Sequence, residues 1–339
     1  MHGYFGLCLS LIHEGTLRTR LVACRRMASP HTAENITKMY SELTDEFDIA
    51  GKIRGIVTDN ASSKVKAFKQ KQIEETGDDD DDDFMRCSVD WNELQGQDDF
   101  EAVIPSRYSC LAHTLQLVVK DGLREATSRI QNLIHKCSSF VSSIHKSCKA
   151  TEMLEDNDVP HIPTQNATRW NSTFSMLGGV INAENKSEEI LKKISILISS
   201  SVVITPKDIE VLKEIGDVLA PFANATTILE ADFQPTSGLV IPTVIGLIKS
   251  LERQQPQHVT SLTKGLRCSI TSRFSALQTD DHFIISAALD PRCKLKWVEG
   301  TEEQKRIRML VKQKCAAITS FKSSKTLTSN ETGNNVLLC

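Results

Sequence analysis

The chain has 339 residues, enough for about two domains or for one domain with a large insertion. Hydrophobic residues make up 40% and charged residues 24%, as in ordinary globular proteins, and no apolar run of about 18 residues predicts a membrane span. The formal net charge of −3 gives no overall attraction to nucleic acid. Nucleic-acid binding would therefore require a local basic patch or a further module.

The N-terminus and the cysteines bear on the cellular compartment. The apolar stretch of residues 7–12 is short and no basic segment precedes it, so we do not expect a signal peptide. Ten cysteines are scattered along the chain, and none of them forms a C-x-x-C pair. Several lie at apolar helical positions, where a reduced cysteine acts as a small hydrophobic residue. We therefore predict a reducing compartment, nuclear or cytoplasmic.

Two strands and a helix are predicted at the start of the chain. Residues 4–12 are apolar, residues 13–15 (HEG) form a turn, and residues 17–27 alternate in polarity, which is typical of two successive strands. A helix is expected from residues 29–32 to Phe47. Its apolar stripe consists of Ile36, Met39, Tyr40, Leu43 and Phe47.

The next predicted strand, residues 52–60, ends in an acid, Asp59, and a helix is expected to follow over residues 61–72. A carboxylate at the carboxyl end of a strand, just before a helix, is the local geometry of a metal-binding or nucleotide-binding site. Its hard oxygen atoms suit Mg²⁺. The pair Asp59-Asn60 is also a good turn and helix N-cap, so capping alone is an alternative explanation. The order β-β-α-β-α predicts that the first helix crosses over into a parallel strand.

Residues 76–105 are predicted to form an acidic, disordered loop. Residues 78–83 are six consecutive aspartates, whose charges repel one another and favour a solvated segment. A chelating acidic cluster is the less favoured alternative, because nothing fixes the geometry of these side chains.

The periodicity of helices extends from about residue 109 to about residue 275. Apolar residues recur at intervals of three and four, and the pair Thr205-Pro206 has the residue types of a helix N-cap and first turn. Residues after about 320 are rich in Ser, Thr, Lys and Asn and are expected to fray. Apolar residues of this helical pattern lie within 115–119 and recur over 130–144, and further helices are expected over residues 206–222, 239–251 and 259–277.

Four short segments, taken together, have the order and spacing of a known family. They are residues 57–61 (VTDNA), 109–117 (SCLAHTLQL), 168–173 (TRWNST) and 289–294 (LDPRCK). Their order resembles the transposase core of the hAT superfamily, and in particular its domesticated vertebrate relatives, the zinc finger BED domain-containing proteins. Three further segments resemble the same family: residues 22–26 (VACRR), 31–36 (HTAENI) and 221–226 (PFANAT).

The resemblance implies an α/β fold, a partial RNase H-like core interrupted by a large α-helical insertion domain. The β-β-α-β start and the later helical block fit this fold independently. The expected parts are the N-terminal part of the core (3–75), the acidic loop (76–105), the insertion (106–280), the return to the core (281–320) and a flexible tail (321–339).

In the family, three carboxylates hold two divalent metal ions that cleave and transfer DNA strands, and Asp59 matches the second of these acids. The family's first acid lies before the point matched by Met1, and its third lies in a Ser-Glu-Arg-x-Phe-Ser segment that this sequence lacks. With one acid of three, we expect no catalysis and no retained cofactor. Mg²⁺ is expected only in a longer form, and zinc only through a BED finger, which this sequence does not contain.

Two residues at the entry to the insertion have the spacing of zinc ligands, namely Cys110 and His113. A zinc site needs three or four ligands, and Cys87 is the nearest spare thiol in the sequence. The family carries this Cys/His pair at the same place, so the resemblance implies a local structural role. Zinc binding is the less favoured alternative.

Arg169 and Trp170 match an Arg-Trp segment of the family, in which a tryptophan of the insertion domain can stack on a flipped base. These two residues are the DNA-binding candidates. The alternative, which we favour, is that Trp170 packs the start of a helix and Arg169 pairs with an acid.

Two features near the C-terminal end have structural interpretations. Asp290 precedes Pro291 and is expected to form a turn after a buried segment. Lysines and arginines are frequent in residues 294–314, with glutamates between them. This stretch could contact phosphates, but a solvated helix face is the preferred interpretation.

The expected function is that of a domesticated, transposon-derived nuclear protein without enzymatic activity, associated with DNA or regulating transcription. DNA is the expected partner of the full-length form, and self-association or protein binding is expected through a C-terminal dimerisation region outside this sequence. The alternative is a fragment of an active DDE-type transposase that cleaves and transfers DNA with metal ions. A metabolic α/β enzyme is disfavoured, because the sequence has neither a glycine-rich phosphate loop nor a nucleophile elbow.

Overall fold

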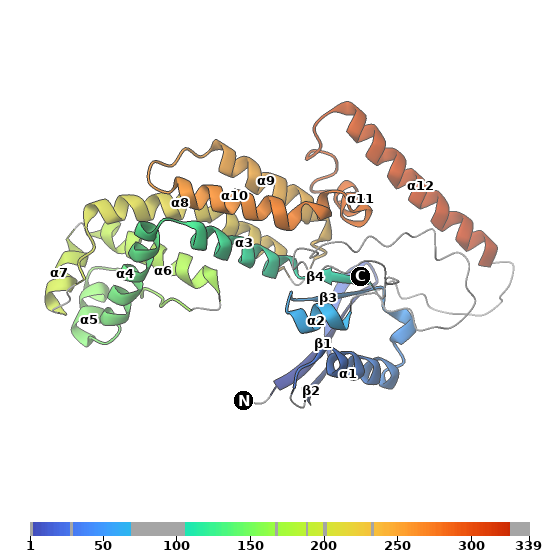
Figure 1. Cartoon of the computed structure of the whole chain (residues 1–339), viewed down its shortest axis with the longest axis horizontal. Helices are drawn as coiled ribbons and strands as arrows, with labels where there is room; N and C mark the ends of the chain where they lie inside the picture. The colour runs from blue at the N-terminus through green and yellow to red at the C-terminus, as the bar shows by residue number, and fades with distance from the viewer. Residues whose placement is uncertain are drawn as a thin grey trace, which may run out of the picture. The chain divides into compact units, whose positions relative to one another are not determined.

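The computed structural model of the chain describes residues 3–27, 30–68, 106–166, 169–187, 189–198, 202–231 and 234–325, with side chains up to residue 317. The chain divides into two compact units, and each is described by itself. Unit 1 consists of residues 1–114, 229–242 and 275–339, and unit 2 consists of residues 115–228 and 243–274. Figure 1 labels the helices and strands of both. The predicted acidic loop, Cys87 and the tail beyond residue 325 lie outside the described residues.

Unit 1 begins with the predicted hairpin. Strand β1 (Gly3–His13) pairs antiparallel with β2 (Thr16–Met27), and the register shifts at a bulge next to Leu7 and Cys8. Glu14 and Gly15 join the strands with φ angles of 50° and 74°. Two successive residues with positive φ form a two-residue hairpin turn, whose twist matches the twist of the two strands that it joins. The predicted turn is therefore confirmed.

The first helix, α1 (Ala33–Glu46), covers one face of the hairpin. Thr32 caps it by accepting a hydrogen bond from the backbone N–H of Asn35 at 3.3 Å. Four residues of the predicted apolar stripe are buried or half-buried, namely Ile36, Met39, Tyr40 and Leu43, but Phe47 is the C-cap residue and is 45% exposed. Ile36 forms a buried cluster with Ala67 and Phe68 at the end of the second helix, and Phe5, Met27, Ala33, Tyr40 and Ile56 pack against this cluster.

A second, separate pair of strands follows. After a short 3₁₀ turn, η1 (Ala50–Lys52), the chain forms β3 (Gly55–Thr58) and α2 (Ser62–Ala67), and β3 pairs in parallel with β4 (Ser106–Ser109). Within the described residues β3 is not hydrogen-bonded to the hairpin, so the predicted single sheet is not observed. The polarity pattern identified β3 as a strand but held no information on its neighbours. The RNase H-like core therefore remains an expectation from the resemblance.

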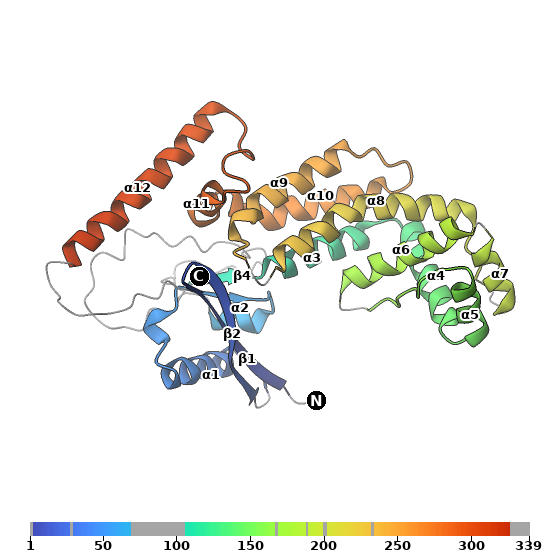
Figure 2. The same ribbon diagram turned by 180° about the vertical axis from the view of Figure 1, so that it is seen from behind.

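The rest of unit 1 consists of η3 (Ser237–Leu239), η4 (Ala276–Gln278), α11 (Asp281–Leu289) and α12 (Thr301–Lys325). The segment before Asp290, whose residues 283–285 and 287–289 are apolar, forms the helix α11. It packs on β4, because the ring of Tyr108 lies 5.2 Å from His282 and 6.2 Å from Phe283. A loop separates α11 from α12, and α12 itself is a single helix without a break (Figures 1 and 2). It continues five residues into the segment that was predicted as a flexible tail.

Unit 2 is helical, as the periodicity predicts, and helices α4 to α7 gather at one end of it in both views (Figures 1 and 2). Thr205 and Asp208 form a capping box at the start of α8, with hydrogen bonds of 2.9 Å and 3.2 Å between side chain and backbone, which confirms the predicted helix start. The helices that lie wholly or mostly in this unit are α3 (Leu111–Glu125), α4 (Ser128–Ile144), α5 (Cys148–Asp156), α6 (Trp170–Lys186), α7 (Ile190–Leu197), α8 (Pro206–Leu229), α9 (Val240–Arg253) and α10 (Thr260–Phe274).

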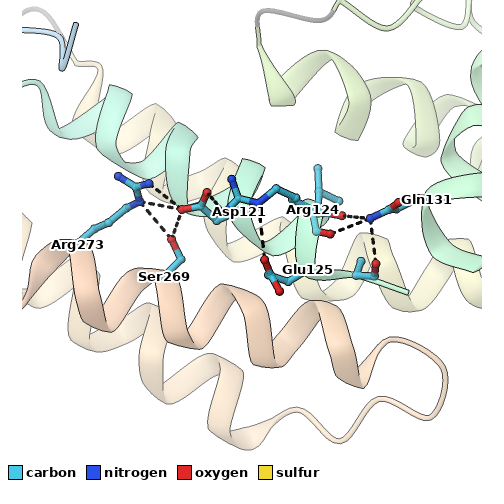
Figure 3. A network of polar contacts seen from close by, with 8 residues as sticks. Asp121, Arg124, Glu125, Gln131, Ser269 and Arg273 are labelled. Atoms are coloured by element: carbon cyan, nitrogen blue, oxygen red, sulfur yellow. Dashed lines mark hydrogen bonds and ion pairs between the residues drawn. The ribbon is translucent and has the colours of Figure 1, made fainter. Parts of the chain in front are cut away.

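A polar network joins α3 to α10 (Figure 3). Oδ2 of Asp121 accepts hydrogen bonds from Oγ of Ser269 at 2.7 Å and from Nε of Arg273 at 2.9 Å. Arg124 lies 3.1 Å from the other carboxylate oxygen of Asp121. Gln131 of α4 donates to three carbonyl groups at the end of α3. These hydrogen bonds and ion pairs hold α3 against α10 on one side and against α4 at its end.

Two glycines allow α3 and α10 to approach closely. A Cβ atom at Gly265 would lie 2.8 Å from Cβ of Glu125 and 3.2 Å from Cα of Gly122. We therefore expect Gly265→Ala to lower the free energy of unfolding by about 1–3 kcal/mol. Gly246→Ala is the control in α9, because a Cβ there meets open space, and it should stabilise the helix by about 0.5–1 kcal/mol. Chemical denaturation of both variants would measure the difference, and equal effects would contradict the close packing.

Candidate site at the ends of strands β3 and β4

The carboxyl ends of β3 and β4 lie at the same edge because the two strands are parallel. Asp59 follows β3 directly, and Cys110 follows β4 directly. The backbone N–H of Cys110 donates to the carbonyl of Thr58 at 2.7 Å, so the ladder extends one residue beyond β4. The structure thus brings together the acid of the first family segment and the start of the second.

Both oxygen atoms of the Asp59 carboxylate have partners in the structure. Oδ1 accepts a hydrogen bond from the backbone N–H of Ala61 at 3.1 Å, and Oδ2 lies 2.7 Å from Nζ of Lys64. The N-cap residue of α2 is Ala61, so the alternative in which Asp59 or Asn60 caps this helix is wrong. Asp59 instead stabilises the turn before α2 and pairs with a lysine on its first turn.

The pKa of Asp59 reflects this pairing. Burial alone would raise the pKa of this carboxyl group. The hydrogen bonds from Lys64 and from the Ala61 N–H, together with the positive charges of Lys64 and His113, outweigh burial and hold the pKa below its ordinary value of 3.8. The carboxylate is therefore ionised at neutral pH, and an ammonium group already compensates its charge.

Arg107 on β4 is the residue of this site that the sequence analysis missed. Its guanidinium donates to Oγ1 of Thr58 at 2.9 Å, to the carbonyl of Asp59 at 2.9 Å and to Oδ1 of Asn60 at 3.1 Å. Asn60 in turn donates to Oγ1 of Thr114 at 3.2 Å. One cation therefore fixes the backbone that carries Asp59, and the site has two basic groups beside one acid.

Cys110 and His113 lie at the start of α3, as the resemblance implies. The carbonyl of Cys110 accepts hydrogen bonds from the N–H and the hydroxyl of Thr114 at 2.9 Å and 3.1 Å, which begins the helix. Nowhere in the described part of the chain do three His, Cys, Asp or Glu side chains form a group that could hold a metal ion. Within these residues the pair has the surroundings of a helix start, and its zinc-binding alternative lacks a third ligand.

The DNA-binding candidates lie in unit 2. Trp170 is the first residue of α6, is 4% exposed, and its ring centroid lies 6.0 Å from that of Phe174. Arg169 is the exposed N-cap residue before it, and its carbonyl accepts a hydrogen bond from the Ser172 hydroxyl at 2.6 Å. The indole packs the start of the helix, as the favoured alternative expects for Trp170, whereas no acid among the described residues pairs with Arg169. In this conformation it offers almost no surface on which a base could stack.

Asp290 is the C-cap residue of α11, and its partner Arg292 connects this end of the helix to a distant segment of unit 1. Its carboxylate, 8% exposed, receives hydrogen bonds from the Arg292 guanidinium at 2.6–3.2 Å. Arg292 also donates to the side chain of Gln234 at 2.6 Å and to the carbonyl of Pro235 at 3.0 Å. A Cβ atom at Gly238 would lie 2.8 Å from Oδ2 of Asp290, so the packing there needs glycine. The expected turn carries a tertiary contact that the sequence did not reveal.

This contact gives unit 1 a pH dependence. The hydrogen bonds from Arg292 hold the pKa of Asp290 below its ordinary value of 3.8, although burial acts in the opposite direction. A carboxyl group with a lowered pKa stabilises the fold above pH 3.8, and the stabilisation is lost as the pH falls through the lowered value. We expect Asp290→Asn to unfold at a lower temperature than the parent chain at neutral pH, and the difference to shrink below pH 3.8. A difference that stays constant from neutral to acidic pH would contradict the ion pair.

Two comparisons with known proteins bear on this chain. Residues 108–218 match the family model described as the ZBED1 RNase-like helical domain. Over 216 residues the chain is 23% identical to zinc finger BED domain-containing protein 4 of Homo sapiens, which covers 61% of this chain and 18% of that protein. The chain thus spans less than a fifth of the length of this relative. The matched residues begin on β4 and include the helices from α3 to α7 and the first half of α8.

Among the described residues, no helix combines the length and the apolar character that crossing a membrane requires.

Proposed function

We propose that this chain, a relative of the hAT-derived zinc finger BED proteins, is a non-catalytic nuclear protein that associates with DNA and takes part in transcription regulation. The observation that carries the absence of catalysis is the pairing of Asp59 with Lys64 at 2.7 Å. In two-metal catalysis, carboxylates hold both cations and the metals activate the attacking and leaving oxygens. A carboxylate that is already paired with an ammonium group is poorly suited to this role.

The charges around Asp59 support the same conclusion. A divalent cation at Oδ2 would have to displace Nζ of Lys64, and it would approach the guanidinium of Arg107, which is hydrogen-bonded to the carbonyl of Asp59. Two positive side chains beside one carboxylate oppose the binding of a further cation. The site is better suited to holding the ends of β3 and β4 together than to binding metal.

One observation favours the alternative, an active strand-transfer enzyme in a longer form. Asp59 lies at the carboxyl end of a parallel strand and its side chain is 38% exposed, so it could reach a metal ion if further carboxylates were supplied. In that case Mg²⁺ would complete the site, and Lys64 would have to move away. The alternative therefore makes an opposite prediction for metal binding.

The test is a titration with Mg²⁺ and with Mn²⁺, followed by thermal unfolding of the purified chain. We expect no shift in the melting temperature, because Lys64 and Arg107 oppose a further cation beside this carboxylate, and no nicking of supercoiled DNA. Asp59→Ala should behave like the parent chain in both assays. Lys64→Met serves as the control, since it frees the carboxylate without adding a charge.

A stabilisation by metal that disappears in Asp59→Ala would sink the non-catalytic proposal. Metal-dependent nicking that is lost in the same variant would establish the alternative directly. Binding of duplex DNA, measured separately by fluorescence anisotropy, tests the association with DNA independently of the metal.

A further inference from the structure

Helix α12 has a charge distribution that the site at β3 and β4 does not explain. Its acids, Glu302 and Glu303, both lie in the first turn, where their negative charges interact favourably with the positive end of the helix dipole. Residues 304–325 contain seven lysines and arginines and no acid, whereas the whole chain has 43 acidic and 40 basic residues. Residues 304–325 are thus a locally basic segment of a chain whose net charge is negative.

One side of α12 packs against the rest of unit 1, to which the helix belongs. Ile307 is 1% exposed, and Leu310 and Val311 are half-buried. Lys314, one turn further on, lies 3.6 Å from Asp281 of α11. These residues recur at intervals of three and four, so they share one face of the helix and leave the opposite face to solvent.

The opposite face carries Lys305, Arg308 and Lys312, all exposed, and we call these three residues the basic face. Their spacing of three and four residues aligns them along about 10 Å of the helix. Lys305 pairs with Glu302 at 2.8 Å, but both side chains are largely exposed, so the pair contributes little. Arg308 and Lys312 have no acidic partner in the part of the chain that the structure describes.

We infer that the basic face of α12 binds the phosphate backbone of double-stranded DNA. This inference rests on the proposed association with DNA and names the surface responsible. Each strand of B-DNA carries one phosphate for about every 3.4 Å of helix axis, so a row of charges about 10 Å long spans the axial rise of roughly three phosphates. The three residues of the basic face are cations, which contact phosphates whatever the base sequence, so we expect this face to bind the duplex with little sequence preference.

The experiment measures the affinity for a fluorescent duplex of about 20 base pairs by anisotropy, over a series of salt concentrations. The test variant is Arg308→Gln with Lys312→Gln, which removes two charges and keeps good helix formers. The matched control is Lys149→Gln with Lys192→Gln, which removes two charges from exposed positions of unit 2. Circular dichroism of each variant checks that its helix content is unchanged.

For the parent chain we expect log K to fall linearly with log salt concentration. The test variant should lower the slope by about 2 and bind roughly 60-fold more weakly near 0.1 M salt, since each phosphate contact contributes a slope of about 0.9. The control variant should bind within about threefold of the parent chain, because only the overall charge has changed.

Binding that is weakened equally by both variants, or by neither, would overturn the inference while leaving the proposed association with DNA intact. A complete lack of duplex binding at low salt would overturn both. If an acidic peptide such as poly-glutamate bound to the parent chain and the duplex did not, the basic face would be a protein-binding surface. That result also contradicts the inference.

Discussion

Replacing Trp170 by alanine is expected to lower the free energy of unfolding by about 3–5 kcal/mol. The side chain is 4% exposed at the start of α6 and its ring packs near that of Phe174, so its removal leaves a cavity in the helical unit. Chemical denaturation followed by far-UV circular dichroism measures the loss. The tryptophan belongs to the Arg-Trp segment that resembles a base-stacking element, so the result also bears on the interaction with DNA.

Two further variants separate packing from DNA contact. Trp170→Phe keeps an aromatic ring in the same space and should cost much less than the alanine variant. Arg169→Gln changes the exposed neighbour and should alter stability by no more than about 0.5 kcal/mol. If Trp170→Ala left stability unchanged but weakened duplex binding, the packing interpretation would be refuted and the indole would be a DNA contact.

Replacing Asp121 by alanine is expected to destabilise unit 2 by about 2–4 kcal/mol. The carboxylate is 16% exposed and the Arg273 guanidinium 26% exposed, so the substitution leaves a poorly solvated cation and removes the acceptor of the Ser269 hydroxyl. Breaking a buried ion pair by removing one partner costs more than the pair contributes, because the other charge remains. Thermal and chemical unfolding would both report this loss.

The control for Asp121 is an ion pair of similar length on the surface. Glu302→Ala removes the partner of Lys305, but the two side chains are 83% and 67% exposed, and the expected loss is below about 1 kcal/mol. In the double variant Asp121→Leu with Arg273→Leu, much of the loss should be recovered, because no charge is left unpaired. A double variant less stable than Asp121→Ala would show that the network contributes more than the ion pair.

The local elements follow from the sequence where a pattern is long or a turn is distinctive. The hairpin has a turn between two strands of 11 and 12 residues, and the helices of unit 2 repeat their apolar positions over several turns. Strand β4 was missed because it has four residues, most of them polar, and follows a long acidic segment. Its place depends on hydrogen bonds to β3, which are tertiary contacts that no local pattern contains.

Some residues of the candidate site could be predicted from the sequence and others could not. Asp59 at the end of a strand could be identified, but whether it would hold a cation or pair with a lysine depends on the direction of one side chain on α2. Arg107 lies 48 residues from the carbonyl it binds, so no sequence spacing indicates the contact. For Trp170 the sequence favoured packing but did not exclude contact with a base, since a tryptophan at the start of a helix can pack inward or face solvent.

The division into two units has a consequence for the order in which the chain can fold during synthesis. The last segment of unit 2 ends at residue 274, whereas unit 1 still lacks α11 and α12 at that point. Tyr108 and the segment around Gln234 therefore leave the ribosome well before His282 and Arg292, the residues they contact. The helical unit can fold while the unit that carries Asp59 is still open, and closure of α11 onto β4 is among the last steps.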